Sequence, residues 1–154
     1  MKRCIKCGQE QVAKATERDS VTVGEHTFEA LLPAQKCRSC GSVVFGAGEL
    51  KLFELRVASE LAQAGTNSPE ALRFMRKAIE LRAADLAELL DVAPETVSRW
   101  EKGKLPVERR ALALLGSLVT DKVEGRSSTL DRLRTLREPK SLEKTVQLEL
   151  NVST

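Results

Sequence analysis

The sequence predicts an α+β fold, in which a small β module held together by cysteines is followed by a domain made only of short helices. Three observations support this prediction. All four cysteines fall within the first 40 residues, apolar residues alternate with polar ones between them, and from residue 47 onward apolar residues recur every three or four positions. Alternation is typical of half-buried strands, and the longer spacing is typical of amphipathic helices. A chain of 154 residues allows one or two such small domains.

The composition is that of a globular protein rather than a disordered or membrane protein. Apolar residues make up 42% of the chain and charged residues 31%. No apolar run approaches the roughly 18 residues that span a bilayer. The start Met-Lys-Arg leads directly into Cys4, so we expect no signal peptide. We therefore expect a cytoplasmic protein that makes no membrane contact. The net charge of +3 is compatible with a nucleic-acid partner but does not argue for one.

The cysteines form two CxxC pairs, and each pair is followed by glycine. The two motifs consist of Cys4, Cys7 and Gly8, and of Cys37, Cys40 and Gly41. Two such pairs separated by a few tens of residues match a four-thiolate zinc site. A glycine after the second cysteine permits the positive φ with which the turn closes, so that backbone N–H groups can point at sulfur. Four thiolates leave a tetrahedral ion no open position for water, so we expect the Zn²⁺ to be structural.

Two other uses of the cysteines fit the sequence poorly. Disulfides are disfavoured in a cytoplasmic chain, and a redox CxxC would lie in a βαβ pattern that residues 1–45 do not show. An enzyme would also need catalytic partners, yet there is no Gly-rich phosphate loop and no carboxylate cluster, and the single histidine is His26. A complete set of thiolates does not need this histidine as a ligand. We therefore expect no enzymatic activity.

The segment between the cysteine pairs predicts a β-hairpin. A turn that contains Gly24 is flanked by apolar residues that mark the two strands: Val21, Val23, Phe28 and Leu31. A further short strand, residues 42–45, follows the second cysteine pair. Together these elements make a zinc-binding β module over residues 1–46. Its core is small, so we expect the fold of the module to depend on the metal.

From Ala47 the spacing predicts helices. Residues 47–67 form an amphipathic linker helix that ends by Gly65 and buries one face made of Leu50, Phe53, Val57 and Leu61. A second domain, residues 68–120, begins at Ser68 and Pro69, because a hydroxyl N-cap followed by proline is a strong helix start. Four short helices are expected in this domain: residues 69–80, 83–90 and 94–101, and a fourth after Pro106 that carries Leu112, Leu115 and Leu118.

The second and third of these four helices predict a helix-turn-helix. A tight turn over residues 91–93 joins them, and the third helix places Val97 and Trp100 on its core side and stops at Gly103. The opposite, polar face of the third helix could read base edges in the major groove of DNA, with Arg99 suited to a bidentate contact with guanine. An ordinary solvated helix face is the alternative interpretation.

Eight residues are candidates for contacting DNA. They comprise the outward face of the third helix and basic residues placed to neutralise phosphate: Glu95, Thr96, Ser98, Arg99 and Lys102, together with Arg82, Lys104 and Arg109. A glutamate can accept a hydrogen bond from N4 of cytosine, and otherwise its charge repels phosphate. The predicted partner is therefore double-stranded DNA.

The stretch from Glu95 to Gly103 (ETVSRWEKG) resembles the Xre/Cro-type helix-turn-helix family, and together with the two CxxCG motifs the chain resembles the MqsA/YgiT-type zinc-finger/helix-turn-helix antitoxins. This resemblance implies an antitoxin of a type II toxin–antitoxin module. Its zinc domain would hold a small ribonuclease toxin, and its helix-turn-helix domain would bind a palindromic operator as a homodimer and repress its own operon. It also implies that Arg99 reads a base, and that Glu95 stands where the family has an amide.

A stand-alone transcriptional regulator of the same architecture is the alternative function. Its N-terminal module would sense metal, bind another protein or only support the fold. The residues of the chain barely separate the two functions, because toxin binding leaves no recognisable motif. A small basic protein that is encoded next to this one and co-purifies with it would favour the antitoxin.

Residues 121–154 predict a C-terminal extension made of a helix and a strand. Ser127 and Ser128 are expected to cap the helix, which ends before Pro139. Residues 144–152 then alternate strictly and place Val146, Leu148, Leu150 and Val152 on one face, which is typical of a half-buried strand. This strand could pair with the other protomer, with the zinc-module sheet or with its own chain.

Overall fold

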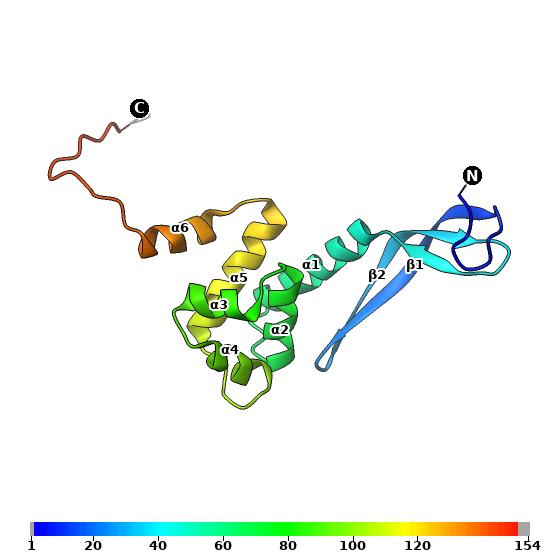
Figure 1. Cartoon of the computed structure of the whole chain (residues 1–154), viewed down its shortest axis with the longest axis horizontal. Coiled ribbons are helices and arrows are strands. Elements are labelled where there is room, and N and C mark those ends of the chain that lie inside the picture. Colours follow the sequence, from blue (N-terminus) through cyan, green and yellow to red (C-terminus); the bar gives the residue numbers. More distant parts are fainter. Residues whose placement is uncertain (1, 151–154) are drawn as a thin grey trace.

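A computed structural model describes residues 2–150, and Figure 1 shows three parts along its length. A β-sheet with the N-terminus lies at one end, a group of helices fills the middle, and the last helix leads into an extended segment at the other end. Three strands come first in the chain and six helices follow them. The predicted α+β fold, with a small β module before an all-α domain, is therefore confirmed.

The sheet is built on a long β-hairpin. Strand β1 (Val12–Val23) pairs in antiparallel register with β2 (His26–Cys37), and Val23 lies opposite His26 across a two-residue turn. Gly24 has φ +59°, which suits the first central position of a type II′ turn, where glycine is favoured. Strand β3 (Val43–Phe45) pairs with the end of β2, so the order is β1-β2-β3. The predicted hairpin and the predicted short strand are confirmed.

Helix α1 (Ala47–Gln63) connects the sheet to the helices through one continuous hydrophobic core. Phe53, Val57 and Leu61 of α1 are buried, as the apolar spacing predicts. Val23 and Leu32 of the sheet belong to the same cluster of buried residues as α1 and the helices that follow. The packing of α1 against both parts therefore fixes the sheet on the helical body.

The helical body contains four helices in the predicted places. They are α2 (Pro69–Ala78), α3 (Ala83–Leu90), α4 (Pro94–Glu101) and α5 (Arg109–Glu124). The Ser68 hydroxyl caps α2 by accepting a hydrogen bond from the Ala71 N–H at 3.1 Å, which satisfies one of the free N–H groups of the first turn. The centre of the body is formed by fully buried side chains, the largest being Trp100, Leu61, Leu72, Met75, Leu86, Leu115, Val97 and Val119.

A buried ion pair joins α2 to the end of α4. Arg76 Nε and Nη2 donate to the two carboxylate oxygens of Glu101 at 2.5 and 3.1 Å, and Nη1 donates to the Leu81 carbonyl at 2.8 Å. Only about a tenth of either side chain is exposed. Bidentate geometry with a third hydrogen bond is what a buried pair needs in order to offset its desolvation. The pair therefore fixes the position of α4 relative to α2.

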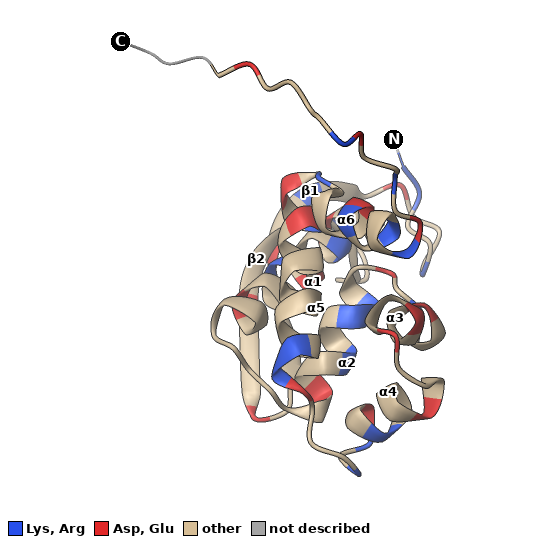
Figure 2. Ribbon diagram, turned by 90° about the vertical axis from the view of Figure 1, so that its left-hand side faces the viewer, with Lys and Arg blue, Asp and Glu red and all other residues tan. Residues whose placement is uncertain are grey.

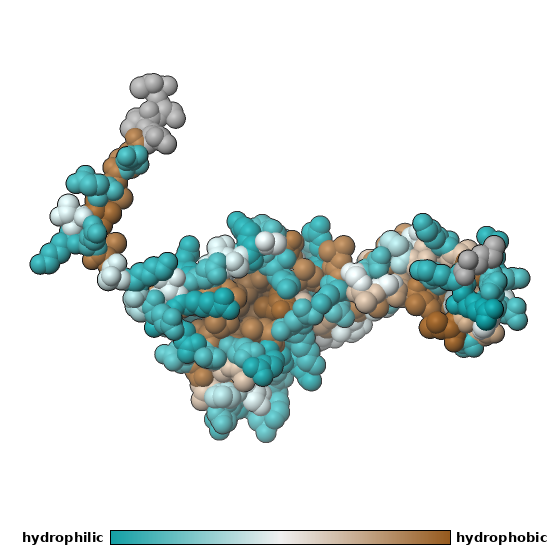
Figure 3. Space-filling view, turned by 45° about the horizontal axis from the view of Figure 1, so that its top comes forward, coloured by the Kyte–Doolittle hydropathy of each residue, from teal (hydrophilic) through white to brown (hydrophobic). Residues whose placement is uncertain are grey.

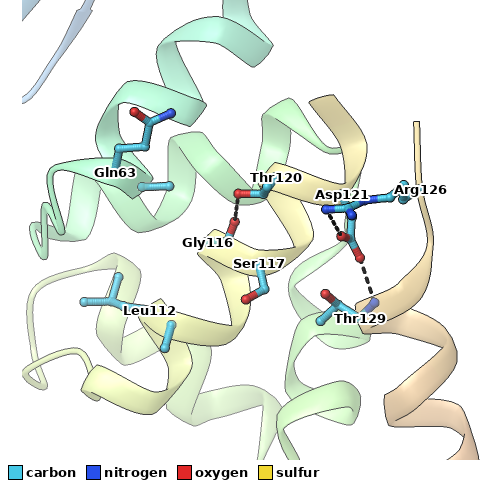
Figure 4. Close-up of a pocket in the computed structure, with 10 residues that line it drawn as sticks. Gln63, Leu112, Gly116, Ser117, Thr120, Asp121, Arg126 and Thr129 are labelled. Atoms are coloured by element: carbon cyan, nitrogen blue, oxygen red, sulfur yellow. Dashed lines mark hydrogen bonds and ion pairs between the residues drawn. The ribbon is translucent and has the colours of Figure 1, made fainter. Parts of the chain in front are cut away.

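The last helix, α6 (Ser128–Arg137), confirms the predicted helix but is capped by a different residue. Neither serine caps it with its side chain: the Ser127 hydroxyl donates to Asp131 at 2.7 Å. Instead, Asp121 of α5 accepts a hydrogen bond from the Thr129 N–H at 2.7 Å, and Arg126 lies 3.8 Å from the same carboxylate (Figure 4). The cap therefore comes from another helix and holds α6 against α5.

Acidification should release this cap. The backbone N–H of Thr129 is the main cause that lowers the pKa of Asp121 below its ordinary value of 3.8, and Arg126 adds to the effect. A carboxylate whose pKa is lower in the folded state stabilises that state above its ordinary pKa, and the contribution disappears as the pH falls through the folded value. We expect the Thr129 amide resonance to shift with pH below about 4 and to lose this titration in Asp121→Asn. An identical titration in the variant would contradict the cap.

Within the described residues of the single chain, the predicted C-terminal strand does not form. Residues 139–150 contain no helix or strand, and Leu148 and Leu150 are about four-fifths exposed; Val152 lies outside the described residues. A strand needs a neighbour to pair its N–H and C=O groups, and in the part of the chain that the structure describes no strand lies beside this segment. The segment has the alternating pattern of a strand, but within residues 2–150 no neighbouring strand pairs with it.

No helix in residues 2–150 has the length and apolar character needed to cross a membrane. The longest is α1, with 17 residues, and it presents charged residues on its exposed face. The prediction of a cytoplasmic protein is not tested by this observation.

Candidate metal centre and nucleic-acid interface

The four cysteine sulfurs converge on one point at the end of the sheet. All four Sγ atoms lie within 4.8 Å of one another. Cys4 lies 3.7 Å from Cys40 and Cys7 lies 3.7 Å from Cys37, sulfur to sulfur, so both contacts join the first CxxC motif to the second. A tetrahedral ion with Zn–S bonds of about 2.3 Å separates its sulfurs by about 3.8 Å. The geometry therefore fits one tetrahedral metal ion, and the separations are far too long for S–S bonds.

Both CxxC motifs form the same closed turn, which explains the glycine after each pair. Gly8 and Gly41 have φ of +75° and +72°, and each donates its N–H to the carbonyl of the first cysteine of its motif at 2.9 Å. The predicted positive φ at these two glycines is confirmed. In the first motif the Lys6 N–H also points at Cys4 Sγ, at 3.4 Å, and such N–H contacts stabilise a thiolate.

Ser42 is a residue of the metal site that the sequence analysis missed. Its hydroxyl lies 3.3 Å from Cys4 Sγ and 3.1 Å from Cys40 Sγ, so it contacts one cysteine of each motif. The Ser42 hydroxyl, helped by backbone N–H groups, lowers the pKa of Cys4 to about 6 and also lowers the pKa of Cys40. The only local signal for this role is a hydroxyl residue directly after the second CxxCG motif.

Replacing Ser42 with alanine should weaken metal binding. Loss of a hydroxyl that supports two ligands removes a contact to the charged sulfurs, and such losses typically cost about 10–100-fold in metal affinity. The affinity can be measured by competition with a chromophoric chelator. Ser39→Ala is the matched control, because Ser39 lies between the two ligands of the second motif and is exposed, whereas the hydroxyl that approaches the sulfurs is that of Ser42. Equal affinities of the two variants would contradict the role of Ser42.

The helix-turn-helix is formed by α3 and α4. Asp91 ends α3 in the left-handed conformation with φ +55°, and α4 starts at Pro94 only three residues later. Val97 and Trp100 of α4 are fully buried against the helical core, as predicted. These contacts fix which face of α4 points away from the protein.

The outward face of α4 carries the predicted DNA-contacting residues. Glu95 and Arg99 are exposed and lie one helical turn apart, and Thr96 and Ser98 beside them are half-buried. Figure 2 shows that acidic and basic residues both occur on this helix. The face therefore combines one hydrogen-bond donor of fixed fork shape, Arg99, with one acceptor, Glu95.

Four further basic candidates surround this helix or its neighbours. Lys102 and Lys104 are exposed beyond α4, where Gly103 turns the chain with φ +69° and the Lys104 N–H bonds to the Arg99 carbonyl at 2.9 Å. Arg109 is exposed at the start of α5. Arg82 instead makes a bidentate ion pair with Asp85, at 2.7 and 2.8 Å. The Asp85 carboxylate competes with phosphate for Arg82, so Arg82 is the weakest of these candidates.

The fold and the cysteine site together define a class of protein. A small β-sheet that can hold a metal ion between two CxxC motifs is joined to a helical domain that contains a helix-turn-helix.

The chain belongs to the MqsA antitoxin family. The family described as the antitoxin component of the bacterial toxin–antitoxin system, MqsA, matches residues 1–123. The predicted family is therefore confirmed. The match includes the sheet, the four cysteines, helices α1 to α4 and all but the last residue of α5, and it does not include α6 or the extended segment. None of the curated proteins compared with the chain matches it.

Proposed function

We propose that this chain is a cytoplasmic, homodimeric antitoxin that binds a palindromic operator and represses its own operon. The observation that carries the proposal is the position of α4. One face of this helix is buried through Val97 and Trp100, and the opposite face is polar and exposed. The buried ion pair between Arg76 and Glu101 fixes the C-terminal end of the helix. A helix held in this way can enter the major groove without first becoming ordered. Membership of the antitoxin family supports this function over a stand-alone regulator.

In this proposal the exposed residues of α4 divide the work of recognition. Arg99 donates two hydrogen bonds to O6 and N7 of a guanine, and Glu95 accepts one from N4 of a cytosine, while Thr96 and Ser98 approach the same base edges. Lys102, Lys104 and Arg109 neutralise phosphates and set the position of the helix on the duplex. Arg82 does so only after it leaves Asp85.

The metal in this proposal is a structural Zn²⁺ held by Cys4, Cys7, Cys37 and Cys40. The sulfur separations fit its bond length, and thiolates are its preferred structural ligands. With four protein ligands no position remains for water, so the ion stabilises the turns at the end of the sheet and supplies no catalysis. The proposed partner of this module is a small ribonuclease toxin.

Arg99→Ala tests the DNA-binding part of the proposal. Loss of a bidentate base contact should weaken specific binding by ~1–3 kcal/mol and leave the fold intact, because the side chain is exposed. Binding is measured by gel-shift titration with DNA from the promoter of the chain's own gene. Arg18→Ala in β1 is the matched control, since it removes the same charge from an exposed site outside the helical body. Equal affinities of the two variants would refute base reading by Arg99.

The toxin part is tested by co-purification. If a neighbouring open reading frame encodes a small basic protein, we expect that protein to co-purify with the tagged full chain and to lose its ribonuclease activity in the complex. A neighbouring product that does not bind, or the lack of any such gene, would contradict the antitoxin function and favour the stand-alone regulator.

A further inference from the structure

The extended C-terminal segment has the side-chain pattern of a strand but no neighbour. Val146, Leu148 and Leu150 lie on one side of the pattern and are 46%, 77% and 80% exposed, and polar residues alternate with them. Figure 3 shows apolar and polar residues exposed along this segment, which stands clear of the rest of the molecule. An exposed apolar row of this kind is unfavourable in water unless another surface covers it.

Strand β2 has a free edge of matching length. Val23 and His26 form the closing, hydrogen-bonded pair of the two-residue hairpin turn. In an antiparallel pair, hydrogen-bonded and non-hydrogen-bonded positions alternate. Thr27, Glu29 and Leu31 are at the non-hydrogen-bonded positions, so their N–H and C=O groups point away from β1. Strand β3 pairs only with Ala34–Lys36 of β2. Within residues 2–150, no other backbone group forms a hydrogen bond with the outward-pointing N–H and C=O groups of Thr27, Glu29 and Leu31. Pro33 has no N–H and ends the free edge.

A groove runs along this edge between β2 and α1. Its volume is about 780 Å³. On the β2 side it is lined by consecutive residues from Thr27 to Ala30, and because side chains alternate between faces, a groove that touches consecutive residues lies along the strand edge. Its α1 side includes Leu52, which is 62% exposed, beside the buried Phe53. Apolar surface and free backbone groups therefore lie side by side.

The groove and the residues that lead into the extended segment have opposite charges. The groove lining contains Glu29, Glu49 and Glu60 and one basic residue, Arg56. Residues 132–144, which lead into the segment, contain five basic side chains and two acidic ones. Complementary charge of this kind favours association and fixes its orientation.

We propose that residues 144–150 of a second copy of this chain add a strand to the free edge of β2. Their backbone would pair with Thr27, Glu29 and Leu31, and the row of Val146, Leu148 and Leu150 would cover Leu52. The extended segment lies at one end of the molecule, and helices α2–α6 lie between it and strand β2 (Figure 1). The segment therefore fills the groove of a partner chain. Such an exchange would supplement the proposed homodimer and remove an open strand edge.

Hydrogen exchange of the full-length, zinc-loaded chain tests the pairing. We expect the amides of Thr27, Glu29 and Leu31 to exchange about tenfold more slowly in the unmodified protein than in Leu148→Glu. Gln147→Glu is the matched control, because it adds a charge at the neighbouring position on the polar side of the segment and should keep the protection. Equal exchange in all three proteins would overturn the proposal.

A mixing experiment identifies the chain that supplies the strand. Leu52→Glu impairs the groove at an exposed site, and Leu148→Glu impairs the segment, so each variant alone should lack protection. We expect ¹⁵N-labelled Leu148→Glu to regain protection of the three amides after it is unfolded and refolded with unlabelled Leu52→Glu and zinc. The unmodified protein treated in the same way controls for refolding. If the mixture stays unprotected, the strand comes from the same chain, or the groove serves another partner, and the proposal is wrong.

Discussion

Cys37→Ser should abolish metal binding and unfold the cysteine end of the sheet. Binding of structural zinc is worth about 10–16 kcal/mol in small zinc domains, and the β module has few buried residues of its own. Cys37 is also almost fully buried at the end of β2, so its loss affects both the site and the strand. We expect zinc content to fall from one ion per chain to none.

The helices should survive this change. Their core is formed by side chains such as Leu72, Trp100 and Leu115, which need no metal. The turn end of the hairpin, near Val23, packs on the same core, so hydrogen exchange should increase from the cysteine end of the sheet and diminish toward Gly24. The control is Ser39→Ala in the same turn. Loss of helical signal throughout the chain would show that sheet and helices unfold as one unit.

Glu101→Ala should lower the free energy of unfolding of the helical body by about 3–5 kcal/mol. The substitution leaves the Arg76 guanidinium buried without its carboxylate, and Leu81 supplies only one of its hydrogen-bond partners. Removing one member of a buried ion pair costs more than the pair contributes, because the remaining charge is not compensated. The measurement is urea denaturation followed by the helical circular dichroism signal.

Two further variants separate the buried charge from other causes. Glu88→Ala breaks an exposed ion pair with Arg137 and should cost at most about 1 kcal/mol. Replacing Arg76 by methionine together with Glu101 by leucine should restore much of the stability, because no charge is then left unpaired. If Glu101→Ala costs no more than Glu88→Ala, the buried pair does not stabilise α4.

Local patterns in the sequence predict the elements well. Ser68 with Pro69 identifies the start of α2, and the αL residue Asp91 lies within the predicted turn between α3 and α4. The hairpin is longer than its apolar residues indicate, because charged residues, Lys14 and Glu17 to Asp19, interrupt the apolar pattern of β1. Glu17 forms a diagonal ion pair with Lys36 of β2 at 2.7 Å, and this contact exists only once the hairpin is formed.

Contacts between distant residues could not be predicted in this way. Arg76 and Glu101 are 25 positions apart. Asp121 and the Thr129 N–H that it caps are eight positions apart and lie on two helices, so their contact depends on how the chain turns between α5 and α6. Ser42 contacts Cys4 only after the two motifs come together. The C-terminal pattern fails for a related reason: alternation describes one strand, whereas a strand forms only with its partner.

The most direct test of the central claim, that α4 is a DNA-reading helix of a dimeric repressor, is a titration of the full chain with its own promoter DNA that reports both stoichiometry and competition. We predict saturation at two chains per palindromic site, with an affinity that unrelated duplex DNA at the same salt concentration does not match. Binding that unrelated duplex displaces equally well would contradict the account.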